Sequence, residues 1–168
     1  MAHTDLLRLQ HDAASQMLVG INCQIRAYRG RDDAYRLTLG IAQLLGLMRI
    51  HLAREDDYLY PELINSGNRQ TAAMARRFAA EMGDFAERLE EYAARWSTSA
   101  GITSRFDEFR RESRAIFAVL ETRIRRENQQ LYPRADRLAA PTLIRVCPMP
   151  PPLPQPVRRG CRRPVPPF

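Results

Sequence analysis

The sequence predicts an all-α protein: an up-down-up-down four-helix bundle with an internal pseudo-twofold repeat and a disordered C-terminal tail. Three observations support this prediction. Apolar residues recur at steps of three and four through four long segments, which is the pattern of helices that pack as a bundle. A motif at residues 51–61 recurs 72 residues later, at 123–133. Ten of the 12 prolines lie after residue 140, where they exclude a regular helix.

Residues 4–29 are the first predicted helix. Thr4 is expected to cap its N-terminus and Gly30 its C-terminus, because these residue types favour those positions. Steps of three and four mark one seam that is expected to face the core. The seam residues are Leu7, His11, Ala14, Leu18, Ile21 and Ile25.

The second predicted helix runs from about residue 32 to about residue 64. Its seam residues are Leu37, Ile41, Leu44, Met48, His51, Glu55 and Leu59. His51 and Glu55 therefore occupy positions where leucine would be expected. Pro61 is expected to bend or interrupt the helix near Tyr58, because proline lacks a backbone N–H.

The third predicted helix spans roughly residues 69–96 and follows a stop and turn at residues 66–68. Its seam residues are Phe78, Met82, Phe85, Leu89, Tyr92 and Trp96. In this register Met82 corresponds to His11 of the first helix. Residues 97–103 are predicted to form a loop.

The fourth predicted helix spans about residues 105–138. Its seam residues are Phe109, Ile116, Leu120, Arg123, Glu127 and Leu131, and Pro133 mirrors Pro61. The first two helices resemble the last two, so the two motifs are expected to face one another across the interior. Residues 1–140 are therefore predicted to be the bundle and residues 141–168 a disordered Pro/Arg-rich tail, with too little apolar bulk for a core.

Composition narrows the function classes. The net charge is +7, but after Asp136 all the charged residues are basic, and the bundle itself is near neutral. Nucleic-acid binding is not expected, because it needs basic residues clustered on the folded part. No run approaches the roughly 18 apolar residues of a membrane span, and no signal-peptide core is present. We therefore expect a cytoplasmic protein without a membrane segment.

The repeated motif carries candidate metal ligands. His51 and Glu55 are four residues apart, so they lie on one face of a helix, one turn apart. This is a spacing with which bundle helices offer ligands to an internal metal. The second copy keeps the carboxylate as Glu127 but has Arg123 where the first has His51. The chain shows no nucleophile–base pair and no phosphate-binding glycine loop, so it is not expected to be an enzyme.

Over roughly residues 5–138, the chain resembles a known family, the hemerythrin-like domains, which are also called HHE cation-binding domains. The resemblance rests on a larger set of residues: His11-Asp12, His51, Glu55-Asp56, Leu59-Tyr60-Pro61, Arg126-Glu127-Asn128 and Leu131-Tyr132-Pro133. It implies a four-helix bundle that holds a non-haem di-iron centre. Members of the family bind oxygen, sense oxygen, nitric oxide or iron, or act in the stress response.

The resemblance also implies roles for individual residues. The implied ligands are His11 from the first helix, His51 and Glu55 from the second, and Glu127 from the fourth, with Glu55 able to bridge two irons. Two positions depart from the family, because Met82 and Arg123 stand where histidines are expected. Asp12 and Asp84 are further carboxylates, but both lie beside the seam. Tyr60 and Tyr132 are interpreted as structural elements at helix ends.

Two hypotheses follow for the function. In the first, the protein senses or binds iron, oxygen or nitric oxide through a weakened, mononuclear non-haem site, since two His and two Glu can hold one iron, manganese or zinc ion. In the second, Arg123 replaces the metal by pairing with Glu55, Glu127 or both. The bundle then acts through a protein partner or as a homodimer. Arg123 could also extend outward past its neighbours and leave the site open.

Overall fold

The computed structural model describes residues 4–139, and these residues form helices without any strand. The all-α prediction is confirmed for this part of the chain. The predicted tail at residues 141–168 lies outside the described residues. The elements in order are α1 (Asp5–Arg26), α2 (Arg31–Arg54), η1 (Glu55–Leu59), α3 (Tyr60–Ile64), α4 (Arg69–Arg95), α5 (Ser99–Ser104), α6 (Phe106–Arg126), η2 (Glu127–Leu131) and α7 (Tyr132–Ala139).

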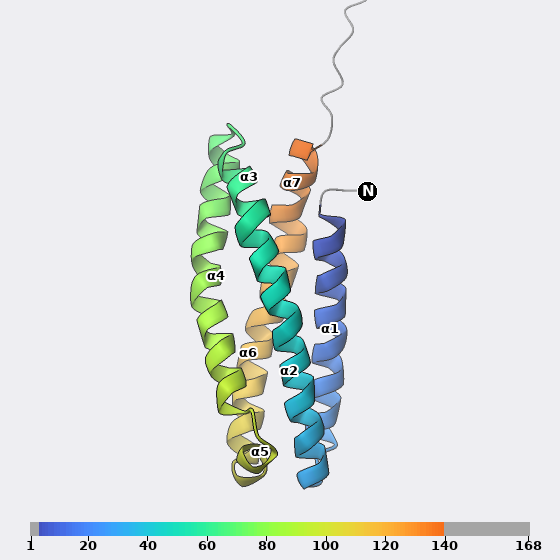
Figure 1. The fold of residues 1–168 in the computed structure, drawn as a ribbon. Coiled ribbons are helices and arrows are strands. Elements are labelled where there is room, and N and C mark those ends of the chain that lie inside the picture. Colours follow the sequence, from blue (N-terminus) through green and yellow to red (C-terminus); the bar gives the residue numbers. More distant parts are fainter. Residues whose placement is uncertain (1–3, 140–168) are drawn as a thin grey trace, which may run out of the picture.

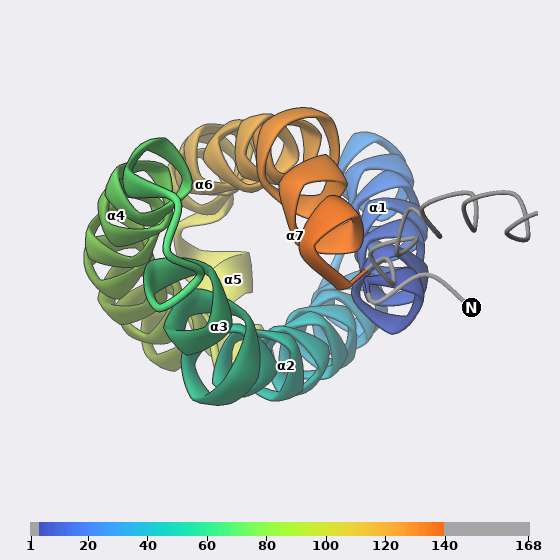
Figure 2. The same cartoon turned by 90° about the horizontal axis from the view of Figure 1, so that it is seen from above.

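The helices stand side by side as a bundle. α2 continues through η1 into α3, and these three elements form one long column (Figure 1). α6 continues in the same way through η2 into α7 and forms a second column. α1 contacts both α2 and α6, and α2 contacts α4. Seen from above, the columns surround a common interior (Figure 2). Within the described residues, no helix is long and apolar enough to cross a membrane.

The predicted seams are the buried faces of the columns. Every seam residue named from the sequence is buried, including the charged ones. The apolar part of the interior divides into two clusters, one that includes Met48, Met82 and Leu120 and another that includes Leu59 and Leu131. His51 and Glu55 lie between Met48 and Leu59 along the seam, so the polar side chains form a layer between the two apolar clusters.

The C-terminal cap predicted for the first helix is wrong, whereas Thr4 is its N-terminal cap residue as predicted. α1 ends at Arg26 with Ala27 as its C-terminal cap, and Gly30 instead precedes α2 as its N-terminal cap. Thr4 does precede α1, but its hydroxyl does not bond to the helix backbone. It donates to Asp136 Oδ1 at 2.8 Å, so this tertiary contact replaces the local cap and ties the start of α1 to α7.

The loop predicted after α4 is also wrong, because all of it from Ser99 onward belongs to helix α5. Thr98 caps this helix by accepting a hydrogen bond from the N–H of Gly101 at 3.1 Å. Ile102 is fully buried, and α5 packs against α2. Burial of Ile102 therefore stabilises a turn of helix that is too short to show a periodic pattern in the sequence. The turn predicted before α4 is confirmed, with Gly67 at a φ of 74°.

The interruption predicted near Tyr58 is confirmed and takes the form of a π-helical turn. The N–H of Tyr60 bonds to the carbonyl of Glu55, five residues earlier, and the N–H of Tyr132 bonds in the same way to Glu127. A π turn contains one residue more than an α turn, so it rotates the residues that follow it. Both copies of the motif contain this turn, and both turns begin at a glutamate that was predicted to be a ligand.

The core around α6 gives a test of the fold. Phe109 is fully buried and contacts the Trp96 ring edge-to-face, with the ring centroids 5.4 Å apart. We predict that Phe109→Ala lowers the free energy of unfolding by about 3–5 kcal/mol, because it leaves a cavity in a packed core. Val119→Ala, on the exposed side of the same helix, is the control and should change it by about 0.5 kcal/mol or less. Urea denaturation measures both, and an equally small loss for Phe109→Ala would contradict this packing.

Candidate metal centre

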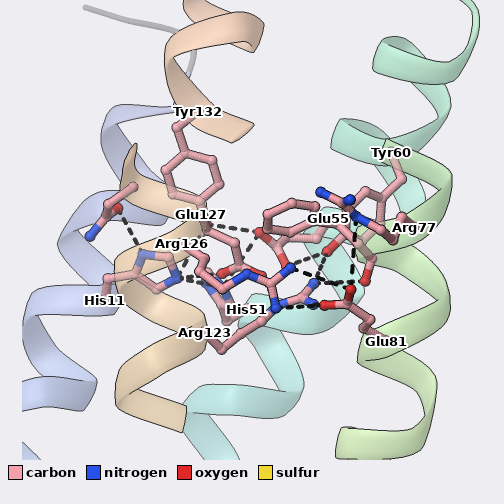
Figure 3. A network of polar contacts seen from close by, with 12 residues as sticks. His11, His51, Glu55, Tyr60, Arg77, Glu81, Arg123, Arg126, Glu127 and Tyr132 are labelled. Atoms are coloured by element: carbon pink, nitrogen blue, oxygen red, sulfur yellow. Dashed lines mark hydrogen bonds and ion pairs between the residues drawn. The ribbon is translucent and has the colours of Figure 1, made fainter. Parts of the chain in front are cut away.

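The polar layer brings together the side chains that the sequence singled out (Figure 3). They come from α1, α2, η1, α6 and η2, and each is at most 5 % exposed. The set is His11, His51, Glu55, Arg123 and Glu127. Charged and polar groups at this depth require partners, because an unpaired buried charge is very costly.

The two histidines face one another through their Nε2 atoms, which are 3.1 Å apart. His11 Nδ1 lies 3.0 Å from Asn128 Oδ1, and His51 Nδ1 lies 3.2 Å from Gln10 Oε1. An amide oxygen only accepts hydrogen bonds, so each Nδ1 carries the ring proton and donates it. In the neutral rings both Nε2 atoms then carry lone pairs that point into the same space.

The carboxylates border the same space. Glu127 Oε2 lies 3.1 Å from His11 Nε2, and Glu55 Oε1 lies 3.8 Å from His51 Nε2. The ligand atoms of His11, His51 and Glu127 all lie within 4.8 Å of one another. Two nitrogen lone pairs and a carboxylate oxygen repel each other unless a cation or a donated proton lies between them. These three side chains could therefore form a metal site.

Tyr60 and Tyr132 belong to the cluster and are more than helix-end elements. The Tyr60 hydroxyl donates to Glu55 Oε2 at 3.2 Å, and the Tyr132 hydroxyl donates to Glu55 Oε1 at 2.8 Å. Burial and then the negative charge of Glu55 raise the pKa of both tyrosines, so both keep their protons as donors. The Tyr132 hydroxyl is also 3.2 Å from His11 Nε2. The helical period did not reveal these contacts, because they depend on the π turns.

Arg123 points into the cluster, and the outward orientation considered from the sequence is wrong. Its Nε donates to Glu127 Oε1, and its Nη2 donates to the Tyr60 hydroxyl at 2.7 Å and to the Phe78 carbonyl at 2.8 Å. Of the two carboxylates expected to pair with it, Glu127 does so directly. The link to Glu55 runs through the Tyr60 hydroxyl (Figure 3).

A carboxylate that the sequence did not single out lies on the outer side of Arg123. Glu81 Oε2 is 3.6 Å from Arg123 Nη1 and accepts a hydrogen bond from Arg126 Nη1 at 2.7 Å. Glu81 precedes the seam residue Met82, which is buried in the apolar core as a filler. Its position beside the seam gave no signal, because partners across helices depend on how the helices are rotated.

The expected extra donors do not join the centre. Asp12 and Asp84 are both exposed, as their positions beside the seam predicted. Arg123 and Met82 occupy the two positions where the family resemblance implied histidines, and neither is a ligand for iron in an oxygen-rich site. Among the described residues, the donors of the layer are therefore two histidines and two glutamates, a set that could hold a metal ion.

Burial controls the charge of the cluster. Burial, assisted by His11, lowers the pKa of His51 to about 4, so this imidazole is neutral near pH 7. Burial and the neighbouring Glu127 raise the pKa of Glu55 above its ordinary value. Burial opposes the charge of Arg123, but Glu127 and Tyr60 outweigh it and raise its pKa. Without a metal, Glu127 thus balances the Arg123 cation, and Glu55 takes up a proton more readily than an exposed glutamate does.

The sequence matches a family of known proteins that is described as cation-binding. Residues 2–135 match the family described as hemerythrin HHE cation binding domain. The chain belongs to this family of cation-binding proteins, as the motifs predicted. No curated protein and no solved structure matches the chain.

The buried histidine predicts a pH effect on stability. The unfolded chain binds a proton at His51 below pH 6.5, whereas the folded protein does so only near pH 4, so acid favours the unfolded state between these values. Glu55 acts in the opposite direction, because its pKa is raised. We therefore compare the metal-free protein with its His51→Gln variant. The stability of the protein relative to the variant should fall by about 3 kcal/mol between pH 6.5 and 4. A difference that is independent of pH would contradict a neutral, buried His51.

Proposed function

We propose that this protein is a non-enzymatic, hemerythrin-like sensor or binder that holds one non-haem iron ion and responds to oxygen or nitric oxide. The proposed ligands are His11, His51 and Glu127, with Glu55 as a further carboxylate. The observation that carries the proposal is the convergence of two Nε2 lone pairs and Glu127 Oε2 within 4.8 Å. Two histidines and one carboxylate are typical of mononuclear non-haem iron sites with open positions.

Iron bound at this place would supply a redox-active cation with coordination positions open to a small diatomic molecule. The surrounding side chains orient its ligands. Asn128 and Gln10 accept the Nδ1 protons of the two histidines and so keep both Nε2 atoms available. The tyrosine hydroxyls hold Glu55 in place, and the apolar clusters on either side of the layer restrict access of water.

Arg123 supports a mononuclear site. Its guanidinium binds Glu127 Oε1 and leaves Oε2 facing His11. The positive charge of Arg123 thus lies beside Glu127. In a site with two metal ions, the second ion would neutralise the glutamates in this half of the cluster, and Arg123 takes that role here. A fixed cation also repels a divalent ion, so we expect a weaker affinity than a site with histidine at this position would have.

The second candidate is a metal-free bundle that acts through a protein partner or as a homodimer. The contacts of Arg123 with Glu127 and Tyr60 favour it, because they satisfy buried charge without any metal. The Nε2 atoms of His11 and His51, which face one another beside Glu127, favour the metal site instead. Metal content separates the two candidates.

The first test is metal content. Protein purified from iron-supplemented cells should contain about one iron per chain, as expected for a mononuclear site. At a free iron concentration 100-fold above Kd, binding stabilises the fold by about 2.7 kcal/mol, so a chelator should lower Tm. Nitric oxide added without oxygen should change the absorption spectrum of the iron-loaded protein.

Two variants make the metal test specific. His51→Gln should abolish iron binding, whereas Asp12→Asn should not, because Asp12 is exposed although it adjoins His11. Absence of metal from the wild-type protein, together with a Tm that chelator leaves unchanged, would reject the iron site and favour the metal-free bundle.

The second test restores a donor at position 123. Arg123→His removes the fixed cation and adds a nitrogen ligand, so metal affinity should rise by about tenfold or more, equal to about 1.4 kcal/mol. Arg125→His is the matched control, because Arg125 is exposed on the same helix. Metal titration followed by calorimetry measures both variants. An unchanged affinity for Arg123→His would show that Arg123 does not limit metal binding.

A further inference from the structure

A cavity of about 390 Å³ lies between α1 and the column formed by α2 and η1, and the metal centre does not include it. Its lining is Leu6, Leu7, Arg54, Tyr58 and Leu59. Leu7 and Leu59 are buried, whereas Leu6 is 49 % and Tyr58 71 % exposed. The cavity therefore has an apolar interior and opens toward solvent. Its volume lies at the small end of the range for ligand sites, about 300–1,000 Å³.

Among the described residues that line the cavity, Arg54 is the one that carries a charge. Its Nη1 atom is shielded from water and has no hydrogen-bond partner. Buried polar atoms in folded proteins are nearly always paired, so an unpaired one points to a missing partner. The missing partner of a guanidinium is an oxygen acceptor, most favourably a carboxylate that binds its N–H groups in pairs.

The internal repeat shows what Arg54 lacks. Its counterpart in the second motif is Arg126, and both Nη atoms of Arg126 have hydrogen-bond partners. Both Nη atoms of Arg126 bond to Glu81, at 2.7 and 3.3 Å, and its guanidinium lies 4.8 Å from the centre of the Phe78 ring. In the second half of the bundle, an anionic side chain and an aromatic ring thus surround the equivalent arginine.

The first half has neither of these neighbours. By the register that pairs Met82 with His11, the position of Glu81 corresponds to Gln10 and that of Phe78 to Leu7. Gln10 is neutral and faces His51 Nδ1. A leucine is smaller than a phenylalanine and fills less of the space beside Arg54. The unpartnered Nη1 atom and the cavity are therefore explained by the same difference between the two halves, which lies in these two side chains.

We propose that this cavity binds a small amphipathic organic anion: a carboxylate that carries a short apolar chain. The carboxylate pairs with the Arg54 guanidinium, in the role that Glu81 has for Arg126. The apolar chain packs against Leu7 and Leu59, in the space that Phe78 occupies in the other half. The single cation among the described lining residues matches one negative charge, which favours a monocarboxylate over a phosphate. This site is separate from the proposed iron function and does not depend on it.

The proposal is tested with octanoate as the probe and the full-length, metal-free protein. Calorimetric titration should show saturable binding of about one octanoate per chain, as expected for a single pocket. Octan-1-ol and octylamine have the same chain length but lack the negative charge, so they should bind at least tenfold more weakly. Chemical shift changes in an NMR titration should centre on Leu7, Arg54 and Leu59.

Three variants separate a built site from general apolar binding. Arg54→Gln removes the charge and should weaken octanoate binding at least tenfold. Leu7→Phe introduces the ring found at position 78 and should block the cavity. Arg36→Gln is the matched control and should leave binding unchanged, because Arg36 is exposed on the same helix. Circular dichroism shows whether each variant is folded. If Arg54→Gln is unfolded, Leu7→Phe still tests the cavity, and octan-1-ol and octylamine still test the requirement for a negative charge.

Several outcomes would overturn the proposal. Failure of octanoate to bind the wild-type protein would do so directly. Equal binding of octanoate and octan-1-ol would reject the role of Arg54, and equal binding by folded Leu7→Phe would reject the cavity. Binding to phosphatidylcholine vesicles without binding to free octanoate would assign the surface to a membrane instead.

Discussion

Two glutamates buried at the centre of a helical bundle must be neutralised, and the polar contacts of the interior satisfy this requirement. Glu127 is paired with Arg123, and Glu55 accepts hydrogen bonds from two tyrosines. Burial beside Glu127 raises the pKa of Glu55, so a proton can serve where a second cation is absent. A buried pair of this kind contributes little net stability, but loss of one partner is strongly destabilising. The cluster is therefore tightly coupled, and a change in any one of its members affects the others.

The backbone provides the geometry that the cluster needs. Each π turn begins at a glutamate and ends just before a tyrosine, and it brings that tyrosine toward the interior. Tyr60 lies five residues after Glu55, a separation that a regular α-helix would place on a different face. The interruption of both long columns is thus part of the site. π turns inside α-helices are frequently found at functional sites.

The pseudo-twofold repeat has diverged in a consistent way. The half built around His11 and His51 keeps the nitrogen donors and faces them toward Glu127, whereas the other half has Met82 and Arg123 at the corresponding positions. Outside the centre, it is the second half that has the more complete set of polar contacts. There the second half keeps a charge pair between Arg126 and Glu81, and the first half leaves Arg54 unpaired beside a cavity. Each half therefore lacks in one place a feature that the other half has.

The sequence by itself determined the helical class, the buried seams and the identity of the residues at the centre, because a period of 3.6 residues places such positions on one face whatever the details of packing. It also determined the family, through motifs that the matched residues confirm. Only the tertiary structure decided that Arg123 turns inward to Glu127, that Tyr60 and Tyr132 hold Glu55, and that Thr4 bonds to Asp136. These contacts join residues from different helices or across a π turn. They depend on the rotation and depth of each helix, which local periodicity does not encode.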